Sequence, residues 1–332
     1  MGSITQARLY FIDLDLSSHP HQNGRILTSN TDGTNLTTLV SGLKHLPDGI
    51  VADPQNDHLY WTNMGASMSN PTDGSIQCCN ISDGSHITTI VPEGLLHTPK
   101  QLTLVRPHNP SESARLYWCD KEGMRVMRCN LDGSDIETLI QTGFGEEDRK
   151  DKRNWCVGIA VHTKSGFMYW SQKGGSKANQ GRILRAPIQF PDGQLPDKRT
   201  DIETLLDGLP GPIDLHIDDA GRNLYWTDRG DSPSGNSVNT LDLEADRNGK
   251  GEGIYKEKVL TRKLHEGIGL AVDEEAKMMY FTDLCGGVYS AKLNGTEKKT
   301  LFEDVGDCTG IAVVPAYLID MSLLLRESCL HS

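Results

Sequence analysis

Short apolar segments alternate with polar turns along the whole chain, and one aromatic pattern recurs among them. Each copy has an aliphatic residue or methionine, a tyrosine, a second aromatic residue, a variable fourth position, and an acid or amide. The copies read LYFID, LYWTN, LYWCD, MYWSQ, LYWTD and MYFTD, with tyrosines at Tyr10, Tyr60, Tyr117, Tyr169, Tyr225 and Tyr280. Their spacing of 50 to 57 residues indicates a propeller, a solenoid or an array.

Each repeat predicts four strands. An apolar segment precedes every copy after the first, and these segments begin at Gly49, Gln101, Gly158, Asp214 and Gly269. A further strand follows each aromatic pattern and opens with glycine at Gly24, Gly74, Gly123, Gly181 and Gly287. Asp-Gly or Asn-Gly turns at 32–33, 83–84, 132–133 and 294–295 then predict a hairpin to the last strand.

A single four-stranded unit cannot bury both of its faces, whereas a closed ring of units buries each face against a neighbour. The sequence therefore predicts an all-β fold, a six-bladed β-propeller of four-stranded antiparallel blades. The chain begins inside a blade that lacks its innermost strand, and the unpaired segment 310–314 is expected to supply it. We expect one propeller domain over residues 5–315 and a tail over 316–332.

The formal charge of −12 argues against nucleic-acid binding, because that binding depends on clustered lysine and arginine. The leucine run at 323–325 is too short to span a bilayer, so we expect no membrane span. No charged and apolar leader precedes the first strand, so no secretory signal is visible and the compartment stays open. The sequence does not predict an oligomeric state.

Four cysteines occupy related positions in neighbouring repeats. Cys156 and Cys308 stand two residues before strand-opening glycines, and Cys119 and Cys285 stand at or just after the preceding aromatic pattern. These positions fall on one face of a propeller, so Cys119 with Cys156 and Cys285 with Cys308 are disulfide candidates, the alternative being separate buried thiols. Candidate glycosylation sequons stand at Asn35, Asn80 and Asn294.

The repeats resemble those of the YWTD propellers, the family known from the low-density-lipoprotein receptor, over nearly the whole chain. The first copy, with Ile12, and the fourth, which ends in Gln172, depart from the pattern. Shared extensions at 63–67, 172–176 and 228–232 resemble stand-alone fungal members. That resemblance implies a secondary-metabolism catalyst without a cofactor, which dehydrates a hydroxylated tropolone to a quinone-methide-like species and guides a hetero-Diels-Alder cyclisation.

Aligned innermost strands predict which residues surround the axial channel. One column reads Gly49, Gln101, Gly158, Asp214, Gly269 and Gly310. Glycine suits crowding at the axis, so Gln101 and Asp214 either project into the channel or join blades through backbone bonds. The preceding column reads Asp48, Lys100, Val157, Ile213, Ile268 and Thr309, a mixed rim that suits a small organic ligand.

Three histidines share an earlier register and could act as an acid or base near neutral pH: His45, His97 and His265. Equivalent positions on separate blades are too far apart for bonds of about 2 Å to one zinc ion, so no metal is predicted there. Half-exposed histidines without chemistry are the alternative. A calcium-dependent lactonase-like hydrolase using Asp48, Asp214 and Asn154 is a second alternative.

The leading hypothesis is a catalyst that needs no cofactor and binds an apolar conjugated substrate at the channel mouth. Its predicted catalytic residues are His45, His265 and Asp214. Its predicted substrate-binding residues are Asp48, Met64, Met68, His97, Lys100, Gln101, Trp155, Lys173, Arg229 and Thr309. The rival is a non-enzymatic propeller that uses the same face to bind a protein or ligand.

Overall fold

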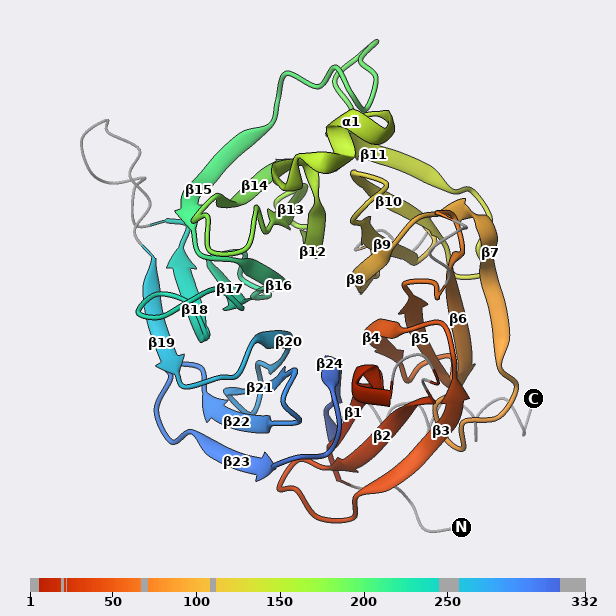
Figure 1. The fold of residues 1–332 in the computed structure, drawn as a ribbon, viewed down its shortest axis with the longest axis vertical. Coiled ribbons are helices and arrows are strands. Elements are labelled where there is room, and N and C mark those ends of the chain that lie inside the picture. The colour runs from red at the N-terminus through yellow and green to blue at the C-terminus, as the bar shows by residue number, and fades with distance from the viewer. Residues whose placement is uncertain are drawn as a thin grey trace.

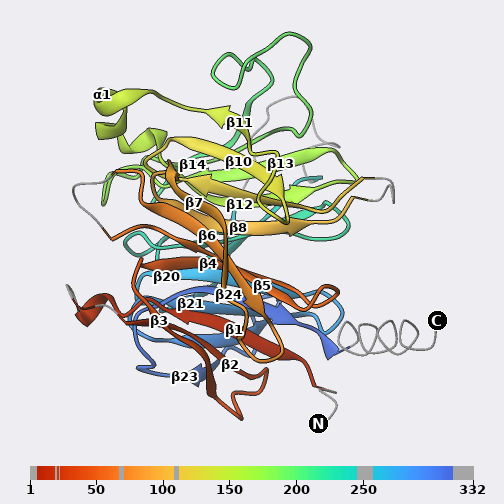
Figure 2. The ribbon, with the colours of Figure 1, turned by 90° about the vertical axis from the view of Figure 1, so that its right-hand side faces the viewer.

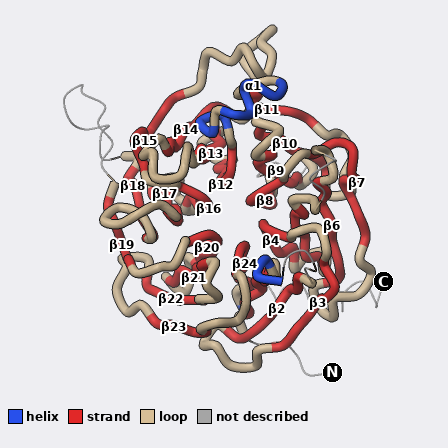
Figure 3. Tube along the Cα trace, viewed as in Figure 1, coloured by secondary structure: helices blue, strands red, loops and turns tan. Residues whose placement is uncertain are grey.

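The chain forms a six-bladed propeller in the computed structural model, which describes residues 6–18, 21, 23–66, 71–107, 112–244 and 257–316. Within these residues six antiparallel sheets, each of four strands, stand around a central axis (Figure 1). Strands dominate the trace, and the helical segments are short (Figure 3). The predicted fold class is confirmed.

The blades follow one another in chain order, with the innermost strand of each given first. Blade one is β24 (Cys308–Val314), β1 (Arg8–Asp13), β2 (Gly24–Asn30) and β3 (Thr37–Leu43). Blade two is β4 (Pro47–Asp53), β5 (His58–Asn63), β6 (Gly74–Asn80) and β7 (Thr88–Leu96). Blade three is β8 (Pro99–Val105), β9 (Arg115–Asp120), β10 (Arg125–Asn130) and β11 (Glu137–Gln141).

The remaining blades repeat this order. Blade four is β12 (Cys156–His162), β13 (Phe167–Gln172), β14 (Gly181–Pro187) and β15 (Glu203–Leu209). Blade five is β16 (Pro212–Ile217), β17 (Asn223–Asp228), β18 (Ser237–Asp242) and β19 (Lys258–Arg262). Blade six is β20 (Gly267–Asp273), β21 (Met278–Asp283), β22 (Val288–Lys292) and β23 (Lys299–Phe302).

Short helical segments lie outside the blades. They are η1 (Leu16–Ser18), α1 (Gly145–Lys150) and η2 (Lys152–Asn154). Figure 2 shows α1 projecting from one face of the ring, beyond the ends of the strands. No helix among the described residues is long and apolar enough to cross a bilayer.

The first and last described strands close the ring. Strand β24 pairs antiparallel with β1, and the register places Arg8 opposite Val314 and Phe11 opposite Ile311. The predicted closure is therefore confirmed. The predicted tail lies outside the described residues except for Ala316.

The core lies between neighbouring blades, as the closed-ring argument requires. The tryptophans of four aromatic patterns are fully buried: Trp61, Trp118, Trp170 and Trp226. One apolar cluster, for example, joins Tyr169 of blade four to Trp226 and Leu215 of blade five. Burial of a large apolar side chain contributes about 1.5 to 3 kcal/mol, so these interfaces dominate the stability of the ring.

In blades two to six the fourth residue of the five-residue pattern joins its blade to the next, whereas blade one has Ile12 at this position, which has no polar side chain. Thr62 accepts a hydrogen bond from the Gly49 amide at 2.9 Å and donates one to the Lys100 carbonyl of blade three at 2.8 Å. Residues Ser171, Thr227 and Thr282 make the equivalent pair of bonds in blades four, five and six. In blade three the Cys119 thiol donates to the Gly158 carbonyl of blade four at 3.2 Å.

The last residue of the pattern holds the loop that precedes or follows its own strand. Asp283 accepts hydrogen bonds from the amides of His265, Cys285 and Gly287. Gln172, which departs from the acidic pattern, accepts a bond from Arg182 at 2.6 Å. The substitution therefore keeps a polar contact within blade four.

The two predicted disulfides are wrong, because all four cysteines are free thiols. The Cys119 thiol already bonds to the Gly158 carbonyl, and burial raises the pKa of Cys119 far above its usual value. Cys285 is exposed, whereas Cys308 is fully buried in an apolar cluster. The alternative of separate buried thiols is correct for Cys119, Cys156 and Cys308 and wrong for Cys285, which is exposed.

The sequon asparagines lie at or beside hairpin turns. Asn35 and Asn294 are exposed, and Asn35 has a positive φ of 56°. Asn80 is partly buried, and its side-chain amide donates to the Ser85 hydroxyl at 3.1 Å. Glycosylation at these three positions stays a prediction.

Candidate functional site

The axial channel is lined by all six innermost strands, and most of the side chains that line it are apolar. It holds a cavity of about 220 Å³, and the polar side chains that line this cavity are Thr103, Asp214 and His216. We call the end of this channel at the starts of the innermost strands the channel mouth. There the column Asp48, Lys100, Val157, Ile213, Ile268 and Thr309 surrounds the axis.

A buried ion pair stands on one side of the channel mouth. The Lys100 ammonium lies 2.5 Å from Asp48 Oδ1 and 3.2 Å from the Met64 sulfur. Gln101 donates from Nε2 to Asp48 Oδ2 at 3.3 Å. Burial lowers the pKa of Lys100, and the Asp48 carboxylate opposes that shift. The structure thus brings together four predicted residues, and the nearby Thr309 hydroxyl bonds to the Pro47 carbonyl at 3.4 Å.

Asp214 is a buried carboxyl group that lines the channel cavity. Its oxygens accept hydrogen bonds from the amide of Leu215 in its own blade and from that of Leu270 in blade six, both at 2.9 Å. Burial raises the pKa of Asp214 to about 8, the two backbone bonds oppose the rise, and Asp48 adds to it. Asp214 therefore both joins blades and stays largely protonated at neutral pH.

The pKa of Asp214 predicts a specific pH dependence of stability. The pKa of Asp214 is about 4 in the unfolded chain and about 8 in the folded protein. Between these two pH values Asp214 is protonated in the folded protein and ionised in the unfolded chain. The unfolding free energy contributed by this group therefore falls as pH rises through that window, by at most about 1.4 kcal/mol per pH unit. We expect Asp214→Asn to remove this pH dependence from the unfolding free energy, measured by urea unfolding at pH 5 to 9. Parallel curves for both proteins would contradict the raised pKa.

A ring of residues directly after the aromatic pattern divides the mouth into two halves. Blades three, four and five place cations there, and blades one, two and six place apolar residues. In chain order the ring is Leu14, Met64, Lys121, Lys173, Arg229 and Leu284. Their backbones hold equivalent positions: the amides of Met64, Lys121, Arg229 and Leu284 each donate to the loop before their own blade's innermost strand.

Trp155 stands in the cationic half of the ring. The ammonium groups of Lys121, Lys152 and Lys173 lie 4.6, 5.4 and 5.9 Å from its ring centroid. Its indole nitrogen donates to the Arg149 carbonyl of α1 at 2.9 Å, which fixes the ring. Trp155 is partly buried, in contrast to the fully buried tryptophans of the core.

Lys173 and Arg229 line one pocket of about 170 Å³ at the mouth. The loops around it are rich in glycine, and Ile213 of the innermost strand forms part of its wall. Arg229 pairs with Glu266 at 2.5 Å. Two predicted substrate-binding residues therefore share a concave surface.

The three predicted histidines do not converge. His45 Nδ1 lies 3.3 Å from Glu93 and borders a separate pocket with Ser41 and Ile87. His265 is exposed, and its backbone amide is held by Asp283. The amide of His97 donates to Asp120, and burial lowers the pKa of the His97 imidazole. Met68 lies outside the described residues.

The residues of the calcium alternative do not come together as a set. Asn154 donates to the Asp148 carbonyl on α1 at 2.9 Å, and Asp48 is paired with Lys100. Within the part of the chain that the structure describes, no group of three or more His, Cys, Asp or Glu side chains could hold a metal ion.

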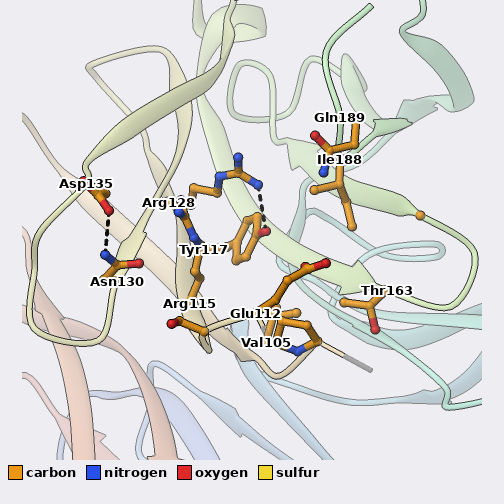
Figure 4. Close-up of a pocket in the computed structure, with 13 residues that line it drawn as sticks. Val105, Glu112, Arg115, Tyr117, Arg128, Asn130, Asp135, Thr163, Ile188 and Gln189 are labelled. Atoms are coloured by element: carbon orange, nitrogen blue, oxygen red, sulfur yellow. Dashed lines mark hydrogen bonds between the residues drawn. The ribbon is translucent and has the colours of Figure 1, made fainter. Parts of the chain in front are cut away.

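Another pocket, of about 690 Å³, lies at the opposite ends of the strands (Figure 4). It is lined by residues at the ends of β8 and β14, and it includes none of the predicted site residues. Arg128 there donates to the Tyr117 hydroxyl at 3.2 Å and to Glu137 at 2.5 Å. Arg115 also pairs with Glu137, so both guanidinium groups already have an acidic partner.

The sequence reasoning missed Lys121, Lys152 and Glu266. Lys121 could have been found, because it occupies the same register after the aromatic pattern as Lys173 and Arg229. Lys152 comes from a loop insertion between blades three and four, which has no equivalent in the other repeats and so no register to align.

The strand order and ring closure define a closed six-bladed β-propeller with a polar channel mouth. No family model matches the chain. It is 47% identical, over 95% of its length, to the whole of a Pyricularia oryzae protein named low-density lipoprotein receptor-related protein 1. It is 35% identical over 93% of its length to the 3-hydroxyacyl-CoA dehydrogenase-like protein LAM1 of Cochliobolus heterostrophus, and spans 65% of that protein.

Among solved structures, a chain of a nidogen/laminin complex matches with a TM-score of 0.66 at 18% identity, over 93% of this chain and 99% of that one. This structural likeness shows the fold alone. Together with the aromatic repeats and the 47% identity to the Pyricularia protein, the chain belongs to the YWTD-repeat propeller family of the low-density-lipoprotein-receptor-related type.

Proposed function

We propose that this propeller is a catalyst of secondary metabolism that needs no cofactor and acts on an apolar conjugated substrate at the channel mouth. The observation that carries the proposal is Asp214, a carboxyl group kept largely protonated in an apolar channel by a pKa near 8. A carboxylic acid that holds its proton at neutral pH can serve as a general acid.

The proposed reaction is the loss of water from a hydroxylated conjugated substrate. Asp214 protonates the leaving hydroxyl, the C–O bond breaks with its electron pair on oxygen, and water departs. A ring hydroxyl of the substrate returns a proton to Asp214, which leaves a quinone-methide-like species. Lys100 stabilises the developing oxygen charge, because its ammonium is buried and held in place by Asp48.

The second step is a cyclisation in which the same species reacts with an alkene in a hetero-Diels-Alder addition. Two bonds form and no group leaves, so the protein contributes orientation alone. An apolar channel wall that holds both reactants in contact can supply this contribution. Asp214 is assigned as the acid in place of His45, which borders a separate pocket, and His265, which is exposed to solvent.

The test is conversion of a panel of hydroxylated conjugated alcohols by the purified chain, followed by mass spectrometry for loss of water, with EDTA and with calcium. We expect turnover that EDTA does not affect, and a drop of at least about 100-fold for Asp214→Asn, in line with the loss of a general acid. Asp273→Asn is the matched control, because Asp273 is a buried carboxylate that bonds to the Ala276 amide away from the mouth.

Other outcomes would replace the proposal. Equal loss of activity in both variants would make Asp214 structural, and turnover that requires calcium would favour the lactonase-like hydrolase. Protein recognition is the second candidate function, because the same face could bind a peptide or a partner domain. Absence of any conversion or retained ligand would favour that candidate.

A further inference from the structure

We infer that the channel mouth binds an organic anion with an apolar body, whose acidic group lies between Lys173 and Arg229 and whose apolar part faces the channel. This inference deepens the proposed function. The claim that the bound anion is the substrate rests on that function. The anion site itself follows from the distribution of charge at the mouth.

Cationic side chains at the mouth outnumber the acidic side chains that contact them. Asp48 pairs with Lys100, Glu122 with Lys121 at 3.0 Å, and Glu266 with Arg229. Among the described residues, no carboxylate pairs with Lys173, whose ammonium lies 5.9 Å from the centroid of the Trp155 ring. The pocket is lined by the cations Lys173, Lys177 and Arg229 and by the acids Asp231 and Glu266, and Asp231 pairs with Lys177 at 3.7 Å. A protein with a formal charge of −12 therefore presents an incompletely neutralised cluster of cations at one concave place.

The cations at the mouth are close enough to act on one another. Burial, then Arg229, Lys121, Lys100 and Lys152 in that order, lower the pKa of Lys173 to about 8. A bound anion would offset this repulsion and favour the charged ammonium. An arginine and a lysine beside one pocket can hold a carboxylate through charge-assisted hydrogen bonds.

The other half of the mouth explains why the anion should carry an apolar body. The ring there consists of Leu14, Met64 and Leu284, of which Leu14 is buried in the core and Met64 and Leu284 are partly exposed. Leu284 packs against an apolar cluster that crosses three blades and consists of Val157, Ile213 and Ile268. The Ile213 side of this cluster also borders the Lys173–Arg229 pocket, so charged and apolar contacts are adjacent. Inorganic phosphate would make only the charged contacts.

Trp155 provides a probe of binding. Because the other tryptophans are fully buried, a ligand beside Lys173 should change chiefly the fluorescence of Trp155. Cyclohexanecarboxylate is a suitable ligand, since it is anionic, has an apolar body and does not absorb where tryptophan is excited. Cyclohexylmethanol offers the same body without charge, and phosphate offers charge without the body.

We expect cyclohexanecarboxylate to bind at least tenfold more tightly than either comparison ligand at pH 7. Lys173→Met and Arg229→Met should each weaken its binding about tenfold, as loss of a charge-assisted hydrogen bond does. Lys299→Met is the matched control, because Lys299 is exposed on β23 of blade six, and it should leave affinity unchanged. Trp155→Phe should remove the fluorescence signal, so the affinity of this variant for cyclohexanecarboxylate is measured by calorimetry.

Two results would overturn the inference: equal affinities for the carboxylate and the alcohol, or unchanged affinity in both Lys173→Met and Arg229→Met with unaltered melting temperatures. Tighter binding of phosphate than of the carboxylate would overturn the claim that the bound anion carries an apolar body. Because binding is measured without turnover, carboxylate binding with no conversion of any alcohol would leave the anion site standing and reject the catalytic proposal alone.

Discussion

Ending the chain before Cys308 should abolish cooperative folding, because this truncation removes the strand that closes the ring. Strand β24 pairs along its length with β1 and also contacts β20 and β4 on either side. Its buried side chains are Cys308, Ile311, Ala312 and Val314. Burial of each large apolar side chain is worth about 1.5 to 3 kcal/mol, and whole domains are stable by only about 5 to 15 kcal/mol.

Loss of β24 would also expose partners in blade six and in its own blade. Thr282 of blade six would lose its acceptor, the Thr309 carbonyl, and Phe11 would lose Ile311 opposite it. Far-ultraviolet circular dichroism during heating measures the result, and a chain that ends at Ala316 is the control because it retains β24. A sharp unfolding transition in the shorter chain, near the temperature of the control, would show that five complete blades suffice.

Gly158→Ala should produce the largest loss of stability among conservative substitutions at the channel. A Cβ atom at this position would lie 1.9 Å from the Ile213 carbonyl oxygen of the neighbouring innermost strand and 3.0 Å from the Ser171 hydroxyl. The same carbonyl accepts the Ser171 hydrogen bond at 2.7 Å. The added methyl must therefore separate blades four and five, at a cost of about 3 kcal/mol.

Gly175→Ala is the matched control for this effect. Gly175 lies in a loop at the channel mouth, where the nearest atom to an added Cβ is the side-chain carbon of Ala178 at 3.3 Å. We expect this variant to unfold within about 0.5 kcal/mol of the wild type in urea, as surface substitutions usually do. Similar losses in both variants would mean that contact between innermost strands does not require glycine at 158.

Glycine at the axis was predicted from the aligned column, and the contacts supply its reason. Gly49, Gly158, Gly269 and Gly310 each approach the innermost strand of the next blade so closely that a Cβ would lie within 3 Å of backbone. The exception at Asp214 was predicted as either a channel residue or a link between blades. It is both, because its carboxyl group lines the cavity and accepts the Leu270 amide.

The candidate site was predicted less well than the fold. The aligned strands placed Asp48 and Lys100 in one column and Gln101 in the next, and the structure brings these three side chains into contact. These residues belong to regular strands whose register follows from the repeat. The histidine register was aligned equally well, yet the His45 imidazole pairs with Glu93 and His265 is exposed to solvent. Those residues lie in loops, where equal spacing along the chain does not fix the direction of a side chain.

The number of blades, the order of their strands and the closure of the ring could all be predicted from the sequence, because these follow from periodic burial and from the register of the aromatic pattern. Which side chains share one environment became visible only in the folded protein. The raised pKa of Asp214, the free thiols of Cys119 and Cys308, and the cations around Trp155 depend on distances between blades. Desolvation and charge interaction act across space, so residues far apart in sequence set them.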